Sequence, residues 1–326
     1  MAVAAAVALT AAVAVVLSML VHSPGPAVSP SAATVPPATA PVSTGVPAAT
    51  GPAAVASKRA RATAGRSRPA TRPPASATAG HSRAAAPPAT AAAEGHRTVT
   101  FVNAVQQTIW VAAGQQTAQP ALSTTGWVLS PGRRLTISVP DHWNGRFWGR
   151  TGCSFDASGQ GRCQTGDCGG EFQCTGYGSI PATLAEFNLN AWDGLDFYDV
   201  SMVDGANLPM WINITSGTTK DPISSDGCST AGCTTPVNCP AALEIHAGGA
   251  VVGCESACGV FGTDQYCCRG QWAPRADCNP TQWPIDYAAV FKRAEPFAYS
   301  YADDDATSTF TCTGECGYRI TFGLTP

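Results

Sequence analysis

The stretch GQGRCQTGDCGGEFQC, residues 159–174, holds three cysteines and five glycines within sixteen residues. Cysteines at this density indicate a metal site, a redox site or a group of disulfide bonds. Zinc sites usually use paired C-x-x-C motifs, often with histidine, but the chain has no C-x-x-C and its five histidines lie outside the cysteine clusters. The pattern therefore favours disulfides over a metal centre, and we expect no metal and no cofactor.

The distribution of the cysteines supports disulfides. All fourteen lie between Cys153 and Cys316, and their number is even, as complete pairing requires. Seven disulfides indicate an oxidising compartment, because cytosolic thiols are kept reduced. We therefore expect a secreted, extracellular protein.

The N-terminal run MAVAAAVALTAAVAVVLSML, residues 1–20, is apolar and uncharged. Such a run serves as a secretory signal peptide or as a single membrane anchor. Alanine dominates it, which makes a weak anchor, so we favour a signal peptide over residues 1–22. Anchoring to a membrane through residues 1–20 stays the alternative.

Residues 23–96 consist mainly of Ala, Pro, Thr and Ser, and this composition predicts a disordered linker. Residues 1–96 carry seven basic residues and one acidic residue, whereas residues 97–326 carry 12 basic and 21 acidic residues, a net charge of −9. The acidic domain argues against nucleic acid as its partner. The basic linker is either a solvated spacer or a contact to an anionic envelope.

The sequence pattern changes at Arg97. RTVTFVN (97–103) alternates polar and apolar residues, as a half-buried strand does, and further short β-rich runs follow between Gly, Pro, Asn and Asp residues. The pattern predicts a mainly β domain over 97–326, with a helix at 281–294 and a loop-rich, disulfide-held subdomain at 221–280. If the first strand and the last strand-like run, YRITFGL (318–324), share a sheet, the ends of the domain lie close together.

The opening stretch resembles the signature of the thaumatin-like family of secreted antifungal defence proteins, G-x-G-x-C-x-T-G-D-C, here residues 159–168. The resemblance covers all of 97–326. Further matching segments are RFWGRTGC (146–153), TLAEF (183–187), DFYDVSMVDGANLPM (196–210), CESACGVFGTDQYCC (254–268), FAYSYADDDATSTFTC (297–312) and YRITF (318–322). The resemblance implies a thaumatin-like β-sandwich, with a disulfide-rich loop subdomain and a short helix-containing region flanking an acidic cleft.

The resemblance also implies a set of disulfides. The family usually has sixteen cysteines, and here Val105 and Gly323 occupy the positions of one bridge, while Glu295 replaces a further cysteine and leaves Cys233 without its usual partner. Cys316 is additional, so we expect it to pair with Cys233. The complete expected set is Cys153–Cys163, Cys168–Cys174, Cys228–Cys312, Cys233–Cys316, Cys239–Cys254, Cys258–Cys267 and Cys268–Cys278.

Five residues of the family's acidic cleft map onto Arg146, Glu186, Asp199, Asp204 and Asp304. Neighbouring carboxylates repel one another, which raises one pKa, and glycoside hydrolysis uses such an acid beside an ionised carboxylate. We expect Glu186 to be the general acid and Asp204 the second catalytic carboxylate, and the other three to bind substrate. The Asp304 assignment is loose by one residue, because aspartates flank it on both sides.

A catalytic role for these acidic residues is one interpretation, and a structural or purely sugar-binding role is the other. Aspartates in turns are usually structural, and an acidic cleft can bind sugar hydroxyls without cleaving anything. Phe147, Trp148, Phe197 and Tyr198 either stack on sugar faces or, as is more common, belong to the core.

The resemblance implies a monomeric protein that acts on a fungal wall surface, binding and weakly hydrolysing β-1,3-glucan as an endo-acting enzyme. The alternative is a defence protein that binds glucan without turnover. A third function, inhibition of an incoming hydrolase, would require a protruding loop, and no unusual insertion is present.

Overall fold

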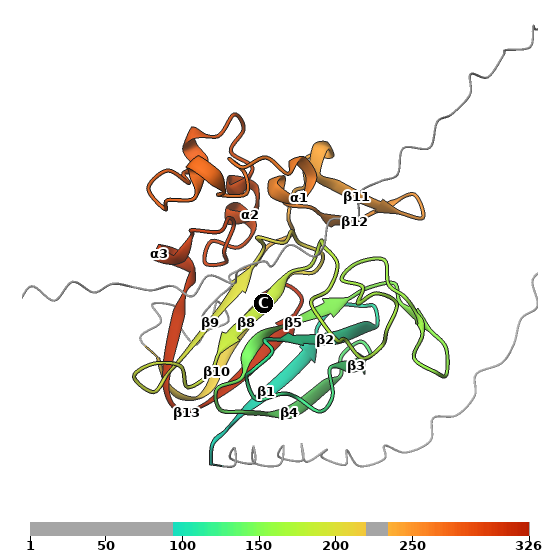
Figure 1. Ribbon diagram of the computed structural model, residues 1–326. Helices are drawn as coiled ribbons and strands as arrows, with labels where there is room; N and C mark the ends of the chain where they lie inside the picture. Colours follow the sequence, from blue (N-terminus) through green and yellow to red (C-terminus); the bar gives the residue numbers. More distant parts are fainter. Residues whose placement is uncertain (1–93, 220–233, 326) are drawn as a thin grey trace, which may run out of the picture. The chain divides into compact units, whose positions relative to one another are not determined.

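The computed structural model describes residues 94–219 and 234–325, coloured in Figure 1. The signal peptide expected at 1–22 and nearly all of the linker expected at 23–96 therefore lie outside the described residues. The same holds for Cys228 and Cys233. No helix among the described residues is long and apolar enough to cross a membrane.

Nine strands form the main sheet (Figure 1). Eight follow the order β3-β2-β5-β8-β9-β13-β1-β4, and β10 pairs with β13. Their bounds are β1 His96–Asn103, β2 Ile109–Gln115, β3 Gly126–Leu129, β4 Arg134–Pro140, β5 Asn144–Arg150, β8 Leu184–Asn188, β9 Leu195–Ser201, β10 Met210–Thr219 and β13 Phe310–Phe322.

The first and last strands share this sheet. β1 runs parallel to β13, from the pair Thr98 and Gly317 to the pair Asn103 and Phe322. The backbone N–H of Ala104 then donates to the carbonyl of Phe322 at 2.8 Å. Hydrogen bonds thus join the two ends of the domain next to the positions where the resemblance implied a missing bridge.

The sheet folds back on itself around one core. Phe101 on β1 and Phe147 on β5 lie far apart in the strand order, yet their rings are 5.1 Å apart. The ring of Phe187 on β8 is likewise 5.0 Å from that of Tyr318 on β13. Because strands that are not sheet neighbours share a core, the expected sandwich is confirmed.

The opening stretch forms a disulfide-held loop on the outer face of β5. The Asp167 carboxylate accepts from the backbone N–H groups of Cys163 and Gly170, at 2.9 and 2.8 Å. The guanidinium of the fully buried Arg150 donates to the carbonyls of Trp110, Glu171 and Phe172. The stretch is therefore a structural staple, and Cys153–Cys163 and Cys168–Cys174 close it as expected. The small strands here are β6 Ser154–Phe155 and β7 Gly161–Arg162.

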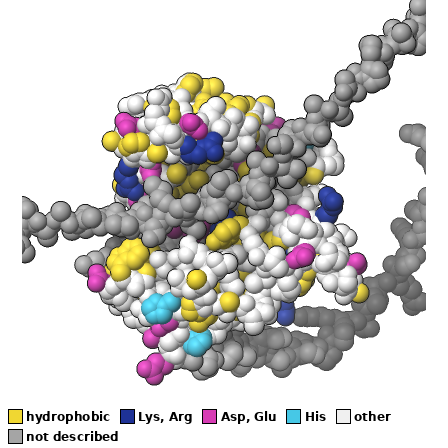
Figure 2. Space-filling model, in the orientation of Figure 1, with side chains coloured by type: hydrophobic (Ala, Val, Ile, Leu, Met, Phe, Trp, Pro, Cys, Tyr) yellow, Lys and Arg dark blue, Asp and Glu magenta, His cyan; other side chains and the backbone are white. Residues whose placement is uncertain are grey.

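A second disulfide-held segment lies at one end of the sheet (Figure 1). Its elements are β11 Glu244–Ala247, β12 Ala250–Cys254, α1 Ala257–Phe261, α2 Ala288–Ala294 and α3 Asp305–Ser308, with single 3-10 turns at Ala241–Leu243, Gly270–Trp272 and Pro280–Gln282. Apolar side chains reach the surface here (Figure 2), including Val251, Val260 and Phe261. The disulfides Cys239–Cys254, Cys258–Cys267 and Cys268–Cys278, all three expected, hold this segment together.

The helix expected at 281–294 is shorter in the structure. It begins only at Ala288, after a separate 3-10 turn at Pro280–Gln282. The Asp286 carboxylate accepts from the N–H of Ala289 at 3.0 Å, within the first helical turn. The basic pair Lys292 and Arg293 lies in the last turn, where it interacts favourably with the helix dipole.

The expected pairing of Cys312 with Cys228 and of Cys316 with Cys233 is wrong, because Cys312 is bonded to Cys316. Thr313 of β13 pairs with Thr218, and Gly317 with Ser216. Three residues of β13 thus bulge opposite a single residue of β10, with Gly314 at a φ of 89°. The bulge brings the Cα atoms of the two cysteines to 6.4 Å, which a regular strand with four-residue spacing cannot do.

Candidate functional site

Three of the five expected site residues form a row across neighbouring strands. Arg146 on β5 lies directly opposite Glu186 on β8, and Glu186 lies directly opposite Asp199 on β9. Side chains directly opposite in antiparallel strands are close neighbours on one face. The adjacent residues Phe147 and Phe187 point into the core, so the row lies on the outer face of the sheet.

Asp204 completes a cluster of four. It lies in the turn after β9, and its Oδ2 accepts from the Arg146 Nη1 at 3.0 Å. The same Nη1 lies 3.8 Å from Oε1 of Glu186. The Arg146 side chain is 10% exposed, whereas those of Glu186 and Asp204 are each 21% exposed. One arginine thus sits between two carboxylates that solvent can reach. Arg146, Glu186, Asp199 and Asp204 are called the acidic cluster below.

Tyr177 covers Arg146 and was missed at the sequence level. Its ring centroid lies 4.0 Å from the guanidinium carbon, a cation–π contact, and the residue is 42% exposed. Gly114, opposite Arg146 on β2, leaves room for the ring, because a Cβ there would lie 2.7 Å from the Tyr177 Cδ1. A lone tyrosine in a loop carries no pattern that would have marked it.

Asp199 is the carboxyl that favours its neutral form. Its Oδ1 is buried with no hydrogen-bond partner among the described residues. Burial, and secondly the charge of Glu186, hold the pKa of Asp199 well above its usual range. The expected pairing of a neutral and an ionised carboxyl thus has a physical basis here, with the proton-holding group at Asp199 in place of Glu186.

Asp304 makes its contacts elsewhere. Its Oδ2 accepts from Lys292 Nζ at 2.7 Å, and from the N–H and hydroxyl of Ser300 at 3.0 and 2.8 Å. These contacts tie α2 to the start of α3, and Asp304 is 8% exposed. Lys292 and Ser300, the partners of Asp304 named above, lie outside the acidic cluster.

Asp305, the neighbour in the sequence, is linked to that cluster through Tyr299. Its carboxylate accepts from the Tyr299 hydroxyl and forms an ion pair with Arg275. Tyr299 runs beside β9, where its N–H donates to the carbonyl of Val200 at 2.8 Å. Burial, followed by the charge of Asp199, raises the pKa of Tyr299. The structure therefore connects the cluster to Asp305 through Tyr299.

Glu255 approaches the cluster from the disulfide-held segment. Backbone hydrogen bonds in both directions between Ala206 and Cys254, each 2.7 Å, place Glu255 beside the turn that carries Asp204. The residue is 5% exposed. Burial, with a contribution from the Asp204 charge, raises the pKa of Glu255 to about 7. At the sequence level, CESAC indicated only disulfides, so this carboxyl was missed.

Comparison with known proteins identifies the family to which these residues belong. The model of the thaumatin family matches residues 103–324. This chain belongs to the thaumatin family. The match includes the staple, the acidic cluster and the disulfide-held segment.

Three similar proteins illustrate the range of the family. "Pathogenesis-related protein 5" of Arabidopsis thaliana is 50% identical over 227 residues, 68% of this chain and 88% of that protein. "Glucan endo-1,3-beta-glucosidase" of Prunus avium is 46% identical over 230 residues, 69% of this chain and 89% of that protein. The solved structure of a thaumatin-like xylanase inhibitor is 24% identical and covers 69% of this chain and 97% of its own, with a TM-score of 0.36. The disulfides and the pathogenesis-related relatives are consistent with secretion.

In this thaumatin-family protein most of the aromatic residues considered for sugar stacking belong to the core. Phe147 and Trp148 are fully buried, and Tyr198 is 1% exposed. Phe197 is on the outer face of β9 and packs on the exposed Trp192, with ring centroids 4.3 Å apart. Tyr177, by contrast, is partly exposed and contacts the acidic cluster through Arg146.

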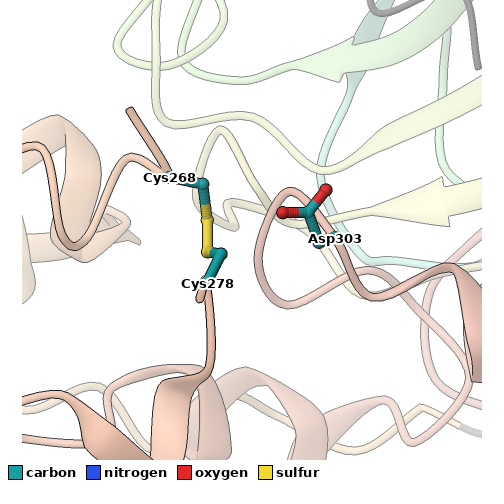
Figure 3. Close-up of side chains that lie close together, drawn as sticks. All are labelled: Cys268, Cys278 and Asp303. Atoms are coloured by element: carbon teal, nitrogen blue, oxygen red, sulfur yellow. A yellow bond between two sulfur atoms is a disulfide. The ribbon is translucent and has the colours of Figure 1, made fainter. Parts of the chain in front are cut away.

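One group of potential metal ligands occurs among the described residues: Cys268, Cys278 and Asp303 (Figure 3). The two sulfurs are bonded to each other, so neither offers a thiolate. Burial raises the pKa of Asp303, and its Oδ2 has no hydrogen-bond partner among the described residues. A metal would need the bond reduced first, so the group does not form a metal centre in the oxidised protein.

Proposed function

We propose that this protein binds β-1,3-glucan of fungal walls at the acidic cluster and hydrolyses it weakly. The observation that supports the proposal is the row of Arg146, Glu186 and Asp199 with Asp204 beside it. The acidic cluster combines two carboxylates that solvent can reach, one carboxyl that favours its proton, and a cation. The glucanase among the relatives supports the same substrate class.

The proposed chemistry divides the roles by exposure and protonation. Asp199 holds the proton of the pair, because burial and the charge of Glu186 raise its pKa. Glu186, the member that solvent reaches, takes up this proton from Asp199 and delivers it to the leaving glycosidic oxygen. Asp204, which forms an ion pair with Arg146, activates the water that adds to the anomeric carbon and takes up its proton. Asp199 and Arg146 hold the geometry and contact sugar hydroxyls.

Tyr177 supplies the apolar contact that a sugar ring needs. A half-exposed ring packed on Arg146 presents a face on which a glucose unit stacks. We therefore place the glucan chain along the exposed edge of the cluster, from Tyr177 towards Asp204. The cleft implied by the resemblance is part of this proposal. Asp304 is retained as a substrate-binding candidate only if the sugar chain extends towards α3.

The second candidate function is glucan binding without turnover. Arg146 neutralises Asp204, and Asp199 is enclosed, so the cluster also suits hydrogen bonding to sugar hydroxyls alone. The pathogenesis-related relatives are compatible with either function.

The test is reducing-sugar release from laminarin by the full oxidised chain and by Glu186→Gln. Glu244→Gln is the matched control, because Glu244 pairs with His246 on β11 outside the cluster. Hydrolysis by wild type and control, with a loss of about a hundredfold or more in Glu186→Gln, is the expected result for general acid catalysis. Absence of hydrolysis together with retention on insoluble β-1,3-glucan would support the binding function. Absence of both would overturn the proposal.

A further inference from the structure

A cavity of about 230 Å³ lies beside Ala206 and Cys254, whose backbones are hydrogen-bonded to each other. Its walls are the segment before β10, the residues that follow residue 233, and β12. Ala206, Leu208 and Cys254, each at most 6% exposed, form its floor. The exposed Val251 and Pro236 form its rim. The cavity is thus mostly apolar and accessible from outside.

One carboxyl group lines this cavity. Glu295, which follows the last residue of α2, is 1% exposed. Its Oε1 accepts from the Thr234 hydroxyl at 2.8 Å and from the N–H of Met210 at 3.2 Å. Its Oε2 is buried and has no hydrogen-bond partner among the described residues. A buried carboxylate oxygen without a partner is costly, so a residue of the cavity wall has an unused acceptor.

The other polar side chains of the lining are already engaged. The Asn207 amide donates to the Gly149 carbonyl and to the Thr165 hydroxyl, and its oxygen accepts from the N–H of Thr183. The Thr235 hydroxyl donates to the carbonyl of Ala294. One free carboxylate oxygen in an apolar cavity does not suit a metal ion, which requires several oxygen ligands. It suits a single donor group attached to an apolar body.

We propose that this cavity is a binding site for a small primary amine with a compact apolar body, whose ammonium group pairs with Glu295 Oε2. Size supports the assignment, because an apolar cavity of about 150 Å³ is enough to hold a benzene ring. Charge supports it as well, because an ammonium offsets the buried carboxylate charge, whereas a neutral hydroxyl leaves that charge uncompensated. The site is independent of the glucan site, since it shares none of the acidic-cluster side chains.

Protonation of Glu295 couples to this binding. Burial raises the pKa of Glu295 to about 7, and the groups that face it are the Thr234 hydroxyl and the Met210 N–H. No charged side chain of the described residues contributes to that pKa. An ammonium ligand binds the ionised form, so the apparent affinity rises with pH and levels off above about 7. Between pH 6 and pH 8 the ionised fraction, and with it the affinity, rises about tenfold.

The experiment is calorimetric titration of the full oxidised chain with benzylamine and, as the neutral match, benzyl alcohol at pH 6 and pH 8. Benzylamine stays protonated at both pH values. We expect it to bind about tenfold more tightly at pH 8 than at pH 6, and at least tenfold more tightly than benzyl alcohol at pH 8. Benzylamine should also release protons from the protein at pH 6.

Two variants and a control identify the site. Glu295→Gln should lose at least tenfold in benzylamine affinity, and Glu244→Gln should bind as wild type does. Should Glu295→Gln fail to fold, Val251→Arg gives the same answer, because Val251 is 49% exposed at the rim and a cation there repels the ligand without disturbing the core. No binding by the wild type, equal binding of alcohol and amine, or unchanged affinity in the variants would overturn the proposal.

Discussion

Glu295 gives the fold a pH dependence of stability opposite to that of carboxylates whose pKa is lowered by ion pairs or hydrogen bonds. Burial raises its pKa from 4.5 to about 7, whereas in the unfolded chain the group keeps its ordinary value. Between these values the folded state binds more protons than the unfolded state, so the free energy of unfolding falls as pH rises. The stabilisation by protonated Glu295 is complete below pH 4.5 and is lost as pH rises through about 7.

The magnitude follows from the same numbers. A rise in pKa from 4.5 to about 7 corresponds to about 3 kcal/mol, at ~1.4 kcal/mol per pKa unit. Glu295→Gln removes the titration and keeps the shape, so its amide carbonyl can still accept from Thr234 and Met210. Relative to wild type, the variant should therefore gain about 3 kcal/mol in free energy of unfolding between pH 4.5 and pH 8.5.

Guanidinium unfolding of the oxidised protein, followed by tryptophan fluorescence at pH 4.5, 6, 7 and 8.5, measures this difference. Other titrating groups change both proteins equally, so the difference between wild type and variant isolates Glu295. Glu244→Gln, at a surface carboxylate, should parallel wild type at every pH. A difference between wild type and Glu295→Gln that stays constant from pH 4.5 to 8.5 would refute the reasoning.

Three further results are expected. Tyr177→Ala should weaken retention on insoluble β-1,3-glucan about fivefold, because stacking of a sugar on the ring is worth about 1 kcal/mol; unchanged retention would exclude the ring from the site. Glu255→Gln should remove an ionisation near pH 7 from the pH profile of laminarin hydrolysis, since that carboxyl has a pKa of about 7 beside Asp204; an identical profile in the variant would argue against its contact with the site. Non-reducing peptide mapping should find Cys312 linked to Cys316, and a peptide joining Cys228 to Cys312 would contradict the structure.

The sequence was sufficient for features that depend on local patterns. Alternation in RTVTFVN (97–103) predicted the first strand, and the spacing in the opening stretch carried the family resemblance and with it two disulfides. The resemblance pointed to Arg146, Glu186 and Asp199, one residue on each of β5, β8 and β9, and the register places all three in one row. The sequence alone could not show that these three residues are neighbours, because this depends on the register of the strands.

The predictions from the sequence that were wrong or missing concern features that depend on the path of the backbone. Cys312 and Cys316 pair because a bulge at Gly314 shortens the strand between them. The family pattern, from which the pairing of these cysteines with Cys228 and Cys233 was expected, does not show this bulge. Among three successive aspartates, Asp305 connects to Tyr299 and Asp304 to Lys292, a difference set by the turn into α3. Tyr177 was missed for the same reason, since its place over Arg146 depends on the course of a loop.

At Glu295 a departure from the family pattern replaces an expected disulfide by a hydrogen bond. The resemblance places a cysteine at this position, where a disulfide would tie the end of α2 to Cys233. In the structure the Glu295 carboxylate instead accepts a hydrogen bond from Thr234, the residue that follows Cys233. The end of α2 is therefore joined to this part of the chain without a covalent bond. A disulfide responds to reducing agents, whereas this tie responds to pH, because ionisation leaves a buried charge that its neutral partners do not offset. The junction should therefore be most secure in mildly acidic surroundings and should loosen above about pH 7, where the adjoining cavity becomes attractive to a cation.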